Sequence, residues 1–206
     1  MARDTASITK QSRREGYALH PKAHKYLAKR TAKPGEKAGR GRRATTSQYS
    51  LQLREKQKVR RLYGLLEKQF AKLMSEASRR QGESGAVLLQ YLEQRIDNVV
   101  YRSGFSVSRQ GARQLVNHGH FELNGTRVDI PSIRLKVGDE VVLREGSKKR
   151  EYFTRIDDLS PANADMIPSW LTVDRKKMKI TVKSLPTRED AESDINEQLI
   201  VEYYSR

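Results

Sequence analysis

The sequence contains no cysteine and only one tryptophan among its 206 residues. Without thiols the chain can form no disulfide, no thiolate nucleophile and no cysteine-based zinc site. Long apolar runs are also missing, and the mean hydropathy is −0.80. No segment is therefore predicted to span a membrane, and no apolar signal core follows the first charges. We expect a soluble protein that stays in the cytoplasm.

Acidic residues are scarce relative to basic ones. The chain has 41 Lys and Arg against 25 Asp and Glu, which gives a formal net charge of +16. An excess of this size favours a polyanionic partner whose counterions are released on binding. Nucleic acid is the first candidate, and an anionic membrane surface is a weaker second.

Residues 1–46 are predicted to form a basic, extended N-terminal arm. Lys and Arg recur beside Tyr17 and Tyr26, while aliphatic residues are too few for a sustained face, so the arm should be largely mobile without a partner. It is either a solvated tail or a segment that RNA orders through arginine and tyrosine. His20 and His24 have the spacing of half a metal site, but no third ligand lies nearby, so we expect no metal.

Residues 47–90 are predicted to form a helical domain. Apolar residues recur at three- and four-residue steps from Val59 to Ala77, as in amphipathic helices. Gly64 weakens a helix by about 1 kcal/mol relative to alanine, so two helices are expected to meet there. The other face carries many cations with few acids four residues ahead to neutralise them, which indicates an external anion. A glycine-rich stretch at 81–85 ends the domain.

Residues 91–155 are predicted to form a small α/β module. An apolar stripe from Leu92 to Val100 favours a first helix that stops near Gly104, and Ser108 is placed to cap a second. After the second helix the sequence has its strongest hairpin signal. Apolar and polar residues alternate from Phe121 to Leu123 and resume from Val128 to Ile130, around a type I′ turn at Asn124-Gly125. After another turn at Val137-Gly138-Asp139, the stretch Glu140–Leu143 completes the predicted sheet.

The second helix of this module carries Arg109 and Arg113 one turn apart, and Gly119 is placed to close its carboxyl end. Helix N-termini and arginines suit phosphates, and His118 and His120 lie beside them, so a folded RNA backbone is the expected ligand. The alternatives are a solubilising arginine face and histidines that serve as caps or core edges.

The last segment, residues 156–206, is predicted to pack against the other domains. Two short strands are expected at 170–173 and 179–182 around a charged turn, and the apolar residues from Leu199 to Tyr203 alternate near the end. Trp170 is interpreted as a core anchor rather than a base-stacking platform. Together these patterns predict an α+β protein in which two helices of the module pack on an antiparallel sheet.

Several stretches carry a family resemblance. They are 12–16 (SRREG), 52–61 (QLREKQKVRR), 92–102 (LEQRIDNVVYR), 104–105, 112–116 (ARQLV), 128–131, 138–139 and 194–202 (DINEQLIVE). They closely resemble the bacterial small-subunit ribosomal protein four family, in order and over nearly the whole chain. A shared RNA-binding module alone would not give a match of this extent.

The resemblance implies a non-enzymatic protein that binds the 5′ domain of 16S ribosomal RNA and helps nucleate small-subunit assembly. It also implies contact with small-subunit ribosomal protein five and other small-subunit proteins, a contribution to decoding accuracy, and in some members repression of the protein's own operon messenger RNA. The region matching Gly39 to Arg43 lies, in the family, near the channel by which messenger RNA enters. Arg40, Arg42 and Arg43 are therefore candidates for that channel, and no cofactor is expected.

The remaining candidate residues are cations and polar groups expected to bind ribosomal RNA. They are Arg13, Arg14, Arg54, Lys56, Lys58, Arg60, Arg61, Arg79, Arg80, Arg102, Ser108, Arg109, Arg113, Gln114, Asn117 and His118.

The chain departs from the family pattern in three places. Many relatives hold zinc with an N-terminal cysteine cluster, so here RNA and packing alone must order the basic segment. Gly111 stands where the family often has an acid that completes a capping box, which should weaken the helix start by about 1 kcal/mol unless phosphate contacts compensate. The stretch from Lys37 to Thr46 also differs in length.

Two other functions are considered. Arg95-Ile96-Asp97 superficially resembles the Arg-Leu-Asp of the pseudouridine-synthase catalytic loop, but Asp97 is expected mid-helix and no separate catalytic domain follows. Uridine isomerisation that is lost on Asp97→Ala would support that enzyme. A free translational regulator or stress-associated RNA-binding factor is the other alternative, and it would not stay with small subunits through a high-salt wash.

Overall fold

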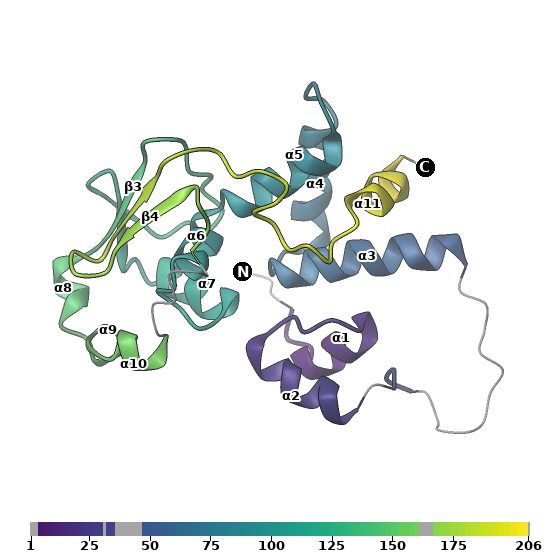
Figure 1. Ribbon diagram of the computed structural model, residues 1–206, viewed down its shortest axis with the longest axis horizontal. Helices are drawn as coiled ribbons and strands as arrows, with labels where there is room; N and C mark the ends of the chain where they lie inside the picture. The colour runs from purple at the N-terminus through teal and green to yellow at the C-terminus, as the bar shows by residue number, and fades with distance from the viewer. Residues whose placement is uncertain (1–3, 31, 36–46, 161–166, 206) are drawn as a thin grey trace. The chain divides into compact units, whose positions relative to one another are not determined.

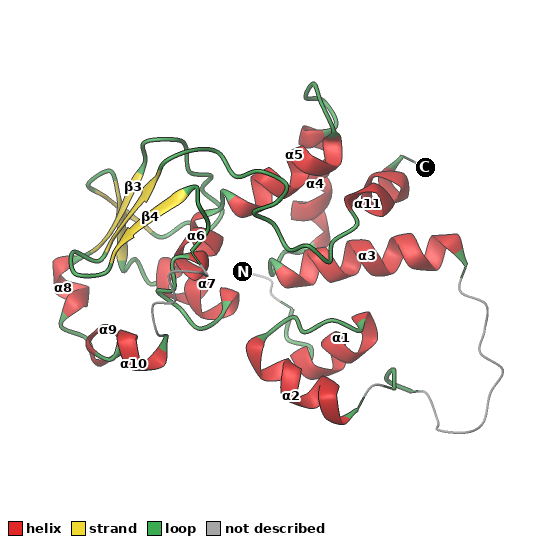
Figure 2. Cartoon of the chain, in the orientation of Figure 1, coloured by secondary structure: helices red, strands yellow, loops and turns green. Residues whose placement is uncertain are grey.

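The computed structural model describes residues 4–30, 32–35, 47–160 and 167–205. The chain divides into two compact units (Figure 1). Unit 1 comprises Met1–Leu88 and Asp194–Arg206, and unit 2 comprises Leu89–Ser193. The predicted α+β class is confirmed, since unit 1 is helical and unit 2 holds the strands (Figure 2). Within the described residues, no helix combines the length and the apolar character that crossing a membrane requires.

Unit 1 is built from helices. They are α1 (Ile8–Glu15), α2 (Pro21–Lys29), α3 (Gln48–Leu62), α4 (Glu67–Ala77), the first half of α5 (Ser84–Glu93), and α11 (Glu197–Tyr204). The predicted break near Gly64 is confirmed, because this residue has a φ of +65° between α3 and α4. Val59 on α3 and Phe70 on α4 are fully buried. The predicted helical periodicity therefore marks a real core.

The chain termini of unit 1 differ from the sequence prediction in two ways. Described residues of the N-terminal arm form a helix pair, in which Leu19 and Ala23 are buried. The alternation noted from Leu199 to Tyr203 is typical of a strand, but these residues lie in the helix α11. Helix α11 lies along α3, where the Tyr49 and Tyr203 rings are 5.8 Å apart.

Unit 2 contains an antiparallel sheet in the order β2-β1-β3-β5-β4. Its strands are β1 (Phe121–Leu123), β2 (Thr126–Val128), β3 (Glu140–Leu143), β4 (Leu171–Asp174) and β5 (Lys179–Val182). The predicted hairpin is confirmed, with Phe121 opposite Val128 and positive φ angles of 50° at Asn124 and 80° at Gly125. These angles fit a type I′ turn. The return strand ends at Val128, however, and Ile130 is 55% exposed.

Strands β4 and β5 belong to this same sheet, because Val141 of β3 pairs with Ile180 of β5. Residues 156–206 therefore do not form one segment, since their strands join unit 2 and their last helix joins unit 1. Three short helices precede β4, namely α8 (Glu145–Lys148), α9 (Glu151–Thr154) and α10 (Ile156–Leu159). Trp170 is 1% exposed, which confirms it as a core residue.

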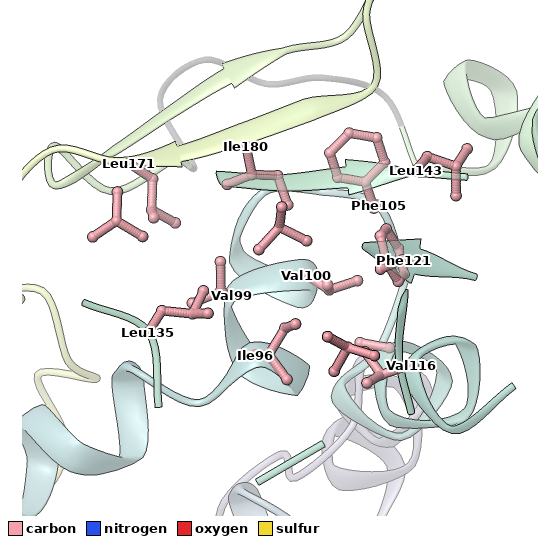
Figure 3. Close-up of a cluster of buried hydrophobic side chains, with 14 of the residues drawn as sticks. Ile96, Val99, Val100, Phe105, Val116, Phe121, Leu135, Leu143, Leu171 and Ile180 are labelled. Carbon is pink, nitrogen blue, oxygen red and sulfur yellow. The ribbon is translucent and has the colours of Figure 1, made fainter. Parts of the chain in front are cut away.

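Two helices, α6 (Ile96–Arg102) and α7 (Arg109–Asn117), pack on the sheet as predicted. Figure 3 shows Ile96, Val99 and Val100 of α6 directed toward Phe121 and Ile180. The predicted apolar stripe from Leu92 to Val100 is split between two helices, α5 and α6. The helical structure is interrupted at Gln94 and Arg95. There the Gln94 carbonyl accepts from Leu135 N–H, and Ile96 N–H donates to the Ile133 carbonyl, each at 2.9 Å.

Candidate nucleic-acid interface

The start of α7 is fixed by Ser108, the predicted cap. Its Oγ accepts from Gly111 N–H at 3.1 Å. A β-carbon on Gly111 would lie only 2.6 Å from Ser106 Oγ. The missing acid of the capping box is therefore explained by packing, since a side chain at position 111 would require Ser106 to move.

Helix α7 has one buried and one exposed side. Ala112 and Val116 are buried in the unit 2 core, whereas Gln110, Gln114, Asn117 and the C-cap His118 are exposed. We call these four exposed residues the α7 face. Three of them were predicted to bind RNA, and Gln110 was missed although it lies one turn before Gln114.

Arg109 is held from three sides within unit 2. Its Nε donates to Asn98 Oδ1 and its Nη2 to Glu192 Oε1, both at 2.9 Å. Its guanidinium also lies over the Tyr101 ring, 4.6 Å from the ring centroid. A purely solubilising role for Arg109 is therefore wrong, because three neighbours fix the orientation of this side chain.

Arg113 points to a buried carboxylate. Its Nη1 lies 3.4 Å from Asp97 Oδ2, and Asp97 also accepts two hydrogen bonds from Arg95, at 3.0 and 2.7 Å. Burial lowers the pKa of Arg113, and the charge of Asp97 opposes that shift. Asp97 lies in the first turn of α6 rather than mid-helix, with its two oxygens engaged by arginines.

Arg102 belongs to the same network. Its Nε and Nη2 donate to the two oxygens of Glu93, at 3.1 and 2.9 Å, and Nη2 also donates to the Asp190 carbonyl at 3.2 Å. Asn98 joins Glu93 to Arg109, because its Nδ2 donates to Glu93 Oε2 at 2.8 Å. All three predicted RNA-binding arginines of unit 2, Arg102, Arg109 and Arg113, are thus already paired with carboxylates of the protein itself.

The prediction of an unpaired cationic face on α3 is wrong. Arg54 and Arg61 both bind Glu15 of α1, whose side chain has no exposed surface. Burial raises the pKa of Glu15, while the two guanidinium groups act in the opposite direction. Lys58 pairs with Glu55 at 2.7 Å.

Two further cations of α3 serve the interior of unit 1. Lys56 is 3% exposed, lies 2.8 Å from Glu67 Oε1, and sits 4.5 Å from the Tyr203 ring centroid. Burial raises the pKa of Glu67, but hydrogen bonds from Lys56 and Tyr204 and the charges of Lys56 and Arg60 together lower it by more, so the net shift is downward. Arg60 donates to Gln57 and to the Leu65 carbonyl.

The other candidates of unit 1 lie nearer the solvent. Arg14, Arg79 and Arg80 are exposed, and Arg13 donates twice to the Ala32 carbonyl, at 3.1 and 2.8 Å. Arg40, Arg42 and Arg43 lie outside the described residues.

Among the described residues, no three His, Cys, Asp or Glu side chains gather as possible metal ligands. His20 instead caps α2, since its Nδ1 accepts from Lys22 N–H at 3.1 Å.

Sequence reasoning missed the acids that organise these arginines. Glu192 lies 83 residues from Arg109 along the chain, and Glu15 lies 46 residues from Arg61. No local spacing rule reaches so far, because i, i+4 pairing covers only neighbours on one helix. Exposed cations between α8 and α9, Lys149 and Arg150, were also not singled out, although their charge pointed to them.

Comparison with known proteins gives a consistent result along the chain. Residues 3–93 match the family model "Ribosomal protein S4/S9 N-terminal domain", and residues 94–141 match "S4 domain". Proteins named "Small ribosomal subunit protein uS4" are similar over the full length of both chains. Those of Chlorobium limicola, Herpetosiphon aurantiacus and Chloroflexus aurantiacus are 50%, 49% and 48% identical.

These matches are to ribosomal proteins rather than to enzymes, so the pseudouridine-synthase alternative is wrong and the chain is not an enzyme. Identity near one half over whole chains also exceeds what a shared module would give. The chain belongs to the uS4 family of small ribosomal subunit proteins.

Proposed function

We propose that this chain is a structural component of the small ribosomal subunit in the cytoplasm, that it binds the 5′ domain of 16S ribosomal RNA directly, and that it nucleates assembly there. Its family membership supports the ribosomal placement. Its net charge of +16 supports an RNA partner, because each phosphate that a cation neutralises releases counterions.

The observation that carries the RNA-binding proposal is the arrangement on α7. Arg109 and Arg113 are each held in one orientation by carboxylates, beside the exposed amides and imidazole of the α7 face. A guanidinium that is already oriented loses less side-chain entropy when it binds a phosphate. Exposed amide groups can then hydrogen-bond to sugar and phosphate oxygens, which fixes register on a folded RNA without reading its sequence.

Unit 1 is proposed to contribute long-range attraction rather than a shaped site. Its exposed cations Arg14, Arg79 and Arg80 carry charge that faces solvent. Such charges strengthen binding in proportion to the phosphates they approach, and their effect falls with salt.

The finer parts of the proposal come from the sequence resemblance. They are contact with small-subunit ribosomal protein five, a contribution to translational accuracy, a position for Arg40, Arg42 and Arg43 near the channel by which messenger RNA enters, and binding of the chain's own operon messenger RNA. Crosslinking from these three positions in assembled subunits tests whether they lie near messenger RNA. If no crosslinks to messenger RNA form, the assignment of these residues to the channel is refuted, and the rest of the proposal is unaffected.

Equilibrium binding tests the central claim. The purified protein should bind a transcript of the 16S 5′ domain more tightly than an unrelated RNA of equal size at physiological salt. Replacing Gln114 and Asn117 together with alanine should weaken binding about tenfold, since each lost hydrogen bond is worth about 0.5–1.5 kcal/mol and tenfold corresponds to about 1.4 kcal/mol. The control is Ser169→Ala with Thr172→Ala, two exposed polar residues of unit 2 away from α7.

Equal affinity for the two RNAs would refute the proposal. Retention on small subunits through a high-salt wash separates a ribosomal component from a free regulator, which the wash would remove.

A further inference from the structure

Glu192 contacts two of the three unit 2 arginines that were predicted to bind RNA, Arg109 and Arg102. Its Oε1 accepts from Arg109 Nη2 at 2.9 Å and lies 3.5 Å from Arg102 Nη2. The residue comes from the segment between β5 and α11, far along the chain from both arginines. One carboxylate oxygen therefore bridges two guanidinium groups.

We propose that Glu192 occupies the position of an RNA phosphate on Arg109 and Arg102, and that RNA displaces its carboxylate on binding. This inference rests on the proposed RNA-binding function and adds the regulation of that site. Carboxylate and phosphate oxygens accept the same charge-assisted hydrogen bonds from a guanidinium, so either anion can satisfy these donors.

The other acid of the network is not exchangeable in this way. Glu93 has no exposed side-chain surface and accepts from both Arg102 and Asn98, so its removal would leave buried donors unsatisfied. The Glu192 side chain is 26% exposed. Its carboxylate therefore borders solvent, unlike that of Glu93.

The surroundings of Arg109 also suit an exchange. When Glu192 leaves, Asn98 still accepts from Nε and the Tyr101 ring still supports the guanidinium plane. The segment that carries Glu192 is not a strand of the sheet. It is held by individual hydrogen bonds, from Gln90 Nε2 to the Pro186 carbonyl and from Arg102 Nη2 to the Asp190 carbonyl, each at 3.2 Å. The carboxylate can thus be replaced without loss of the arginine's orientation.

The exchange has a consequence for selectivity. A phosphate must compete with an anion that is already present, so any RNA gains less from Arg109 than it would from an unoccupied guanidinium. Only an RNA whose other contacts hold a phosphate at this point makes the replacement favourable. Glu192 is then a residue that lowers affinity for unrelated RNA.

The test is Glu192→Gln, which removes the charge and keeps a hydrogen-bond acceptor of the same shape. Affinity for the 16S 5′-domain transcript should rise about three- to fivefold, the range of a partly exposed ion pair. The slope of log affinity against log salt should steepen by about one counterion equivalent. Affinity for unrelated RNA should rise by a larger factor, which reduces the preference between the two RNAs.

Glu189→Gln is the matched control. Glu189 lies on the same segment, is exposed, and forms no ion pair with any described residue. If net charge alone sets affinity, both variants will bind RNA equally, and the inference is overturned. In the Arg109→Ala background the effect of Glu192→Gln on RNA affinity should shrink, because one of the two arginines that Glu192 binds is absent. An undiminished effect would also overturn the inference.

Carbon-13 NMR of the Glu192 carboxyl in the unmodified protein gives an independent readout. Adding the 5′-domain RNA should shift this resonance as the ion pair breaks, and an unchanged resonance in the saturated complex would refute displacement. The proposed function has a separate failure, since it falls if the unmodified protein shows no preference for the 5′-domain transcript. The inference alone falls if that preference exists and Glu192→Gln leaves affinity unchanged.

Discussion

Ser106 Oγ fills the space that a β-carbon on Gly111 would need, 2.6 Å from where that atom would lie. Ser106 is 3% exposed and its Oγ donates to the Ser108 carbonyl at 3.0 Å. The Ser106 hydroxyl is therefore fixed in position within the loop that leads into α7. A glycine at position 111 is a local packing requirement at the start of the helix that carries Arg109.

This relationship predicts a non-additive pair of substitutions. Gly111→Ala alone should leave the free energy of unfolding of unit 2 nearly unchanged or lower it, because the new methyl group displaces Ser106. In a Ser106→Ala background the same change should stabilise unit 2 by up to about 1 kcal/mol, the helix propensity difference between the two residues. Urea unfolding followed by Trp170 fluorescence measures this, since the only tryptophan of the chain lies in the unit 2 core. Equal effects in both backgrounds would show that the close approach has no energetic weight.

A second prediction concerns acid sensitivity of unit 2. His120 is 8% exposed, and its Nδ1 lies 2.9 Å from Ser147 Oγ. Burial lowers the pKa of His120, and the positive charges of Arg150, His118 and Arg144 lower it further. The unfolded chain therefore takes up this proton more readily than the folded one. The resulting stability is fully present above pH 6.5, the unperturbed value, and is lost as the pH falls from there toward the folded pKa.

The urea midpoint of Trp170 fluorescence should accordingly fall between pH 7.5 and pH 5.5. His120→Gln should flatten this dependence, whereas His118→Gln should leave most of it, because His118 is exposed. If His118→Gln flattens the profile and His120→Gln does not, the wrong histidine has been assigned.

The local elements of unit 2 were predictable because their signals are short-range. The Asn124-Gly125 pair specifies a turn with two positive φ angles, and Ser108 three residues before Gly111 specifies a cap. Each of these depends on residues within a few positions of one another. The same holds for the helix break at Gly64.

What the sequence could not supply was long-range pairing. Arg54 and Arg61 of α3 lack a partner at local spacing on their own helix, because the acid that binds both of them comes from α1. Alternation from Leu199 to Tyr203 suggested a strand, but eight residues with a capping Asn196 form a helix against α3 instead. Short apolar runs are ambiguous between the two periods, and packing decides.

The buried Glu15 gives a third prediction, for unit 1. Glu15→Ala would leave Arg54 and Arg61 facing each other without a counter-charge. Breaking such an ion pair lowers the free energy of unfolding by about 3–5 kcal/mol when it is fully buried and by under about 1 kcal/mol when it is exposed. The Glu15 side chain has no exposed surface, but those of Arg54 and Arg61 are 35% and 16% exposed, so we expect a loss of about 2 kcal/mol. Limited proteolysis should then cleave within α1 and α2 faster than in the unmodified protein. Glu83→Ala removes an exposed acid of the same unit and should change neither the free energy of unfolding nor the rate of cleavage. Similar cleavage in both variants would mean that Glu15 does not hold α1 on α3.

The last prediction separates charge from geometry at position 109. Arg109→Lys keeps the positive charge but cannot donate to Asn98 and Glu192 while lying flat on the Tyr101 ring, because an ammonium lacks the planar fork of a guanidinium. If orientation matters, affinity for the 16S 5′-domain transcript should fall about tenfold, one charge-assisted hydrogen bond or so, while the salt slope stays unchanged because no charge is lost. Arg79→Lys at an exposed site of unit 1 is the matched control and should bind like the unmodified protein. Filter binding at four salt concentrations measures both quantities. A lysine that binds as well as arginine at position 109 would mean that this position offers RNA only a charge, and that the contacts of Arg109 with Asn98, Glu192 and Tyr101 stabilise the fold alone.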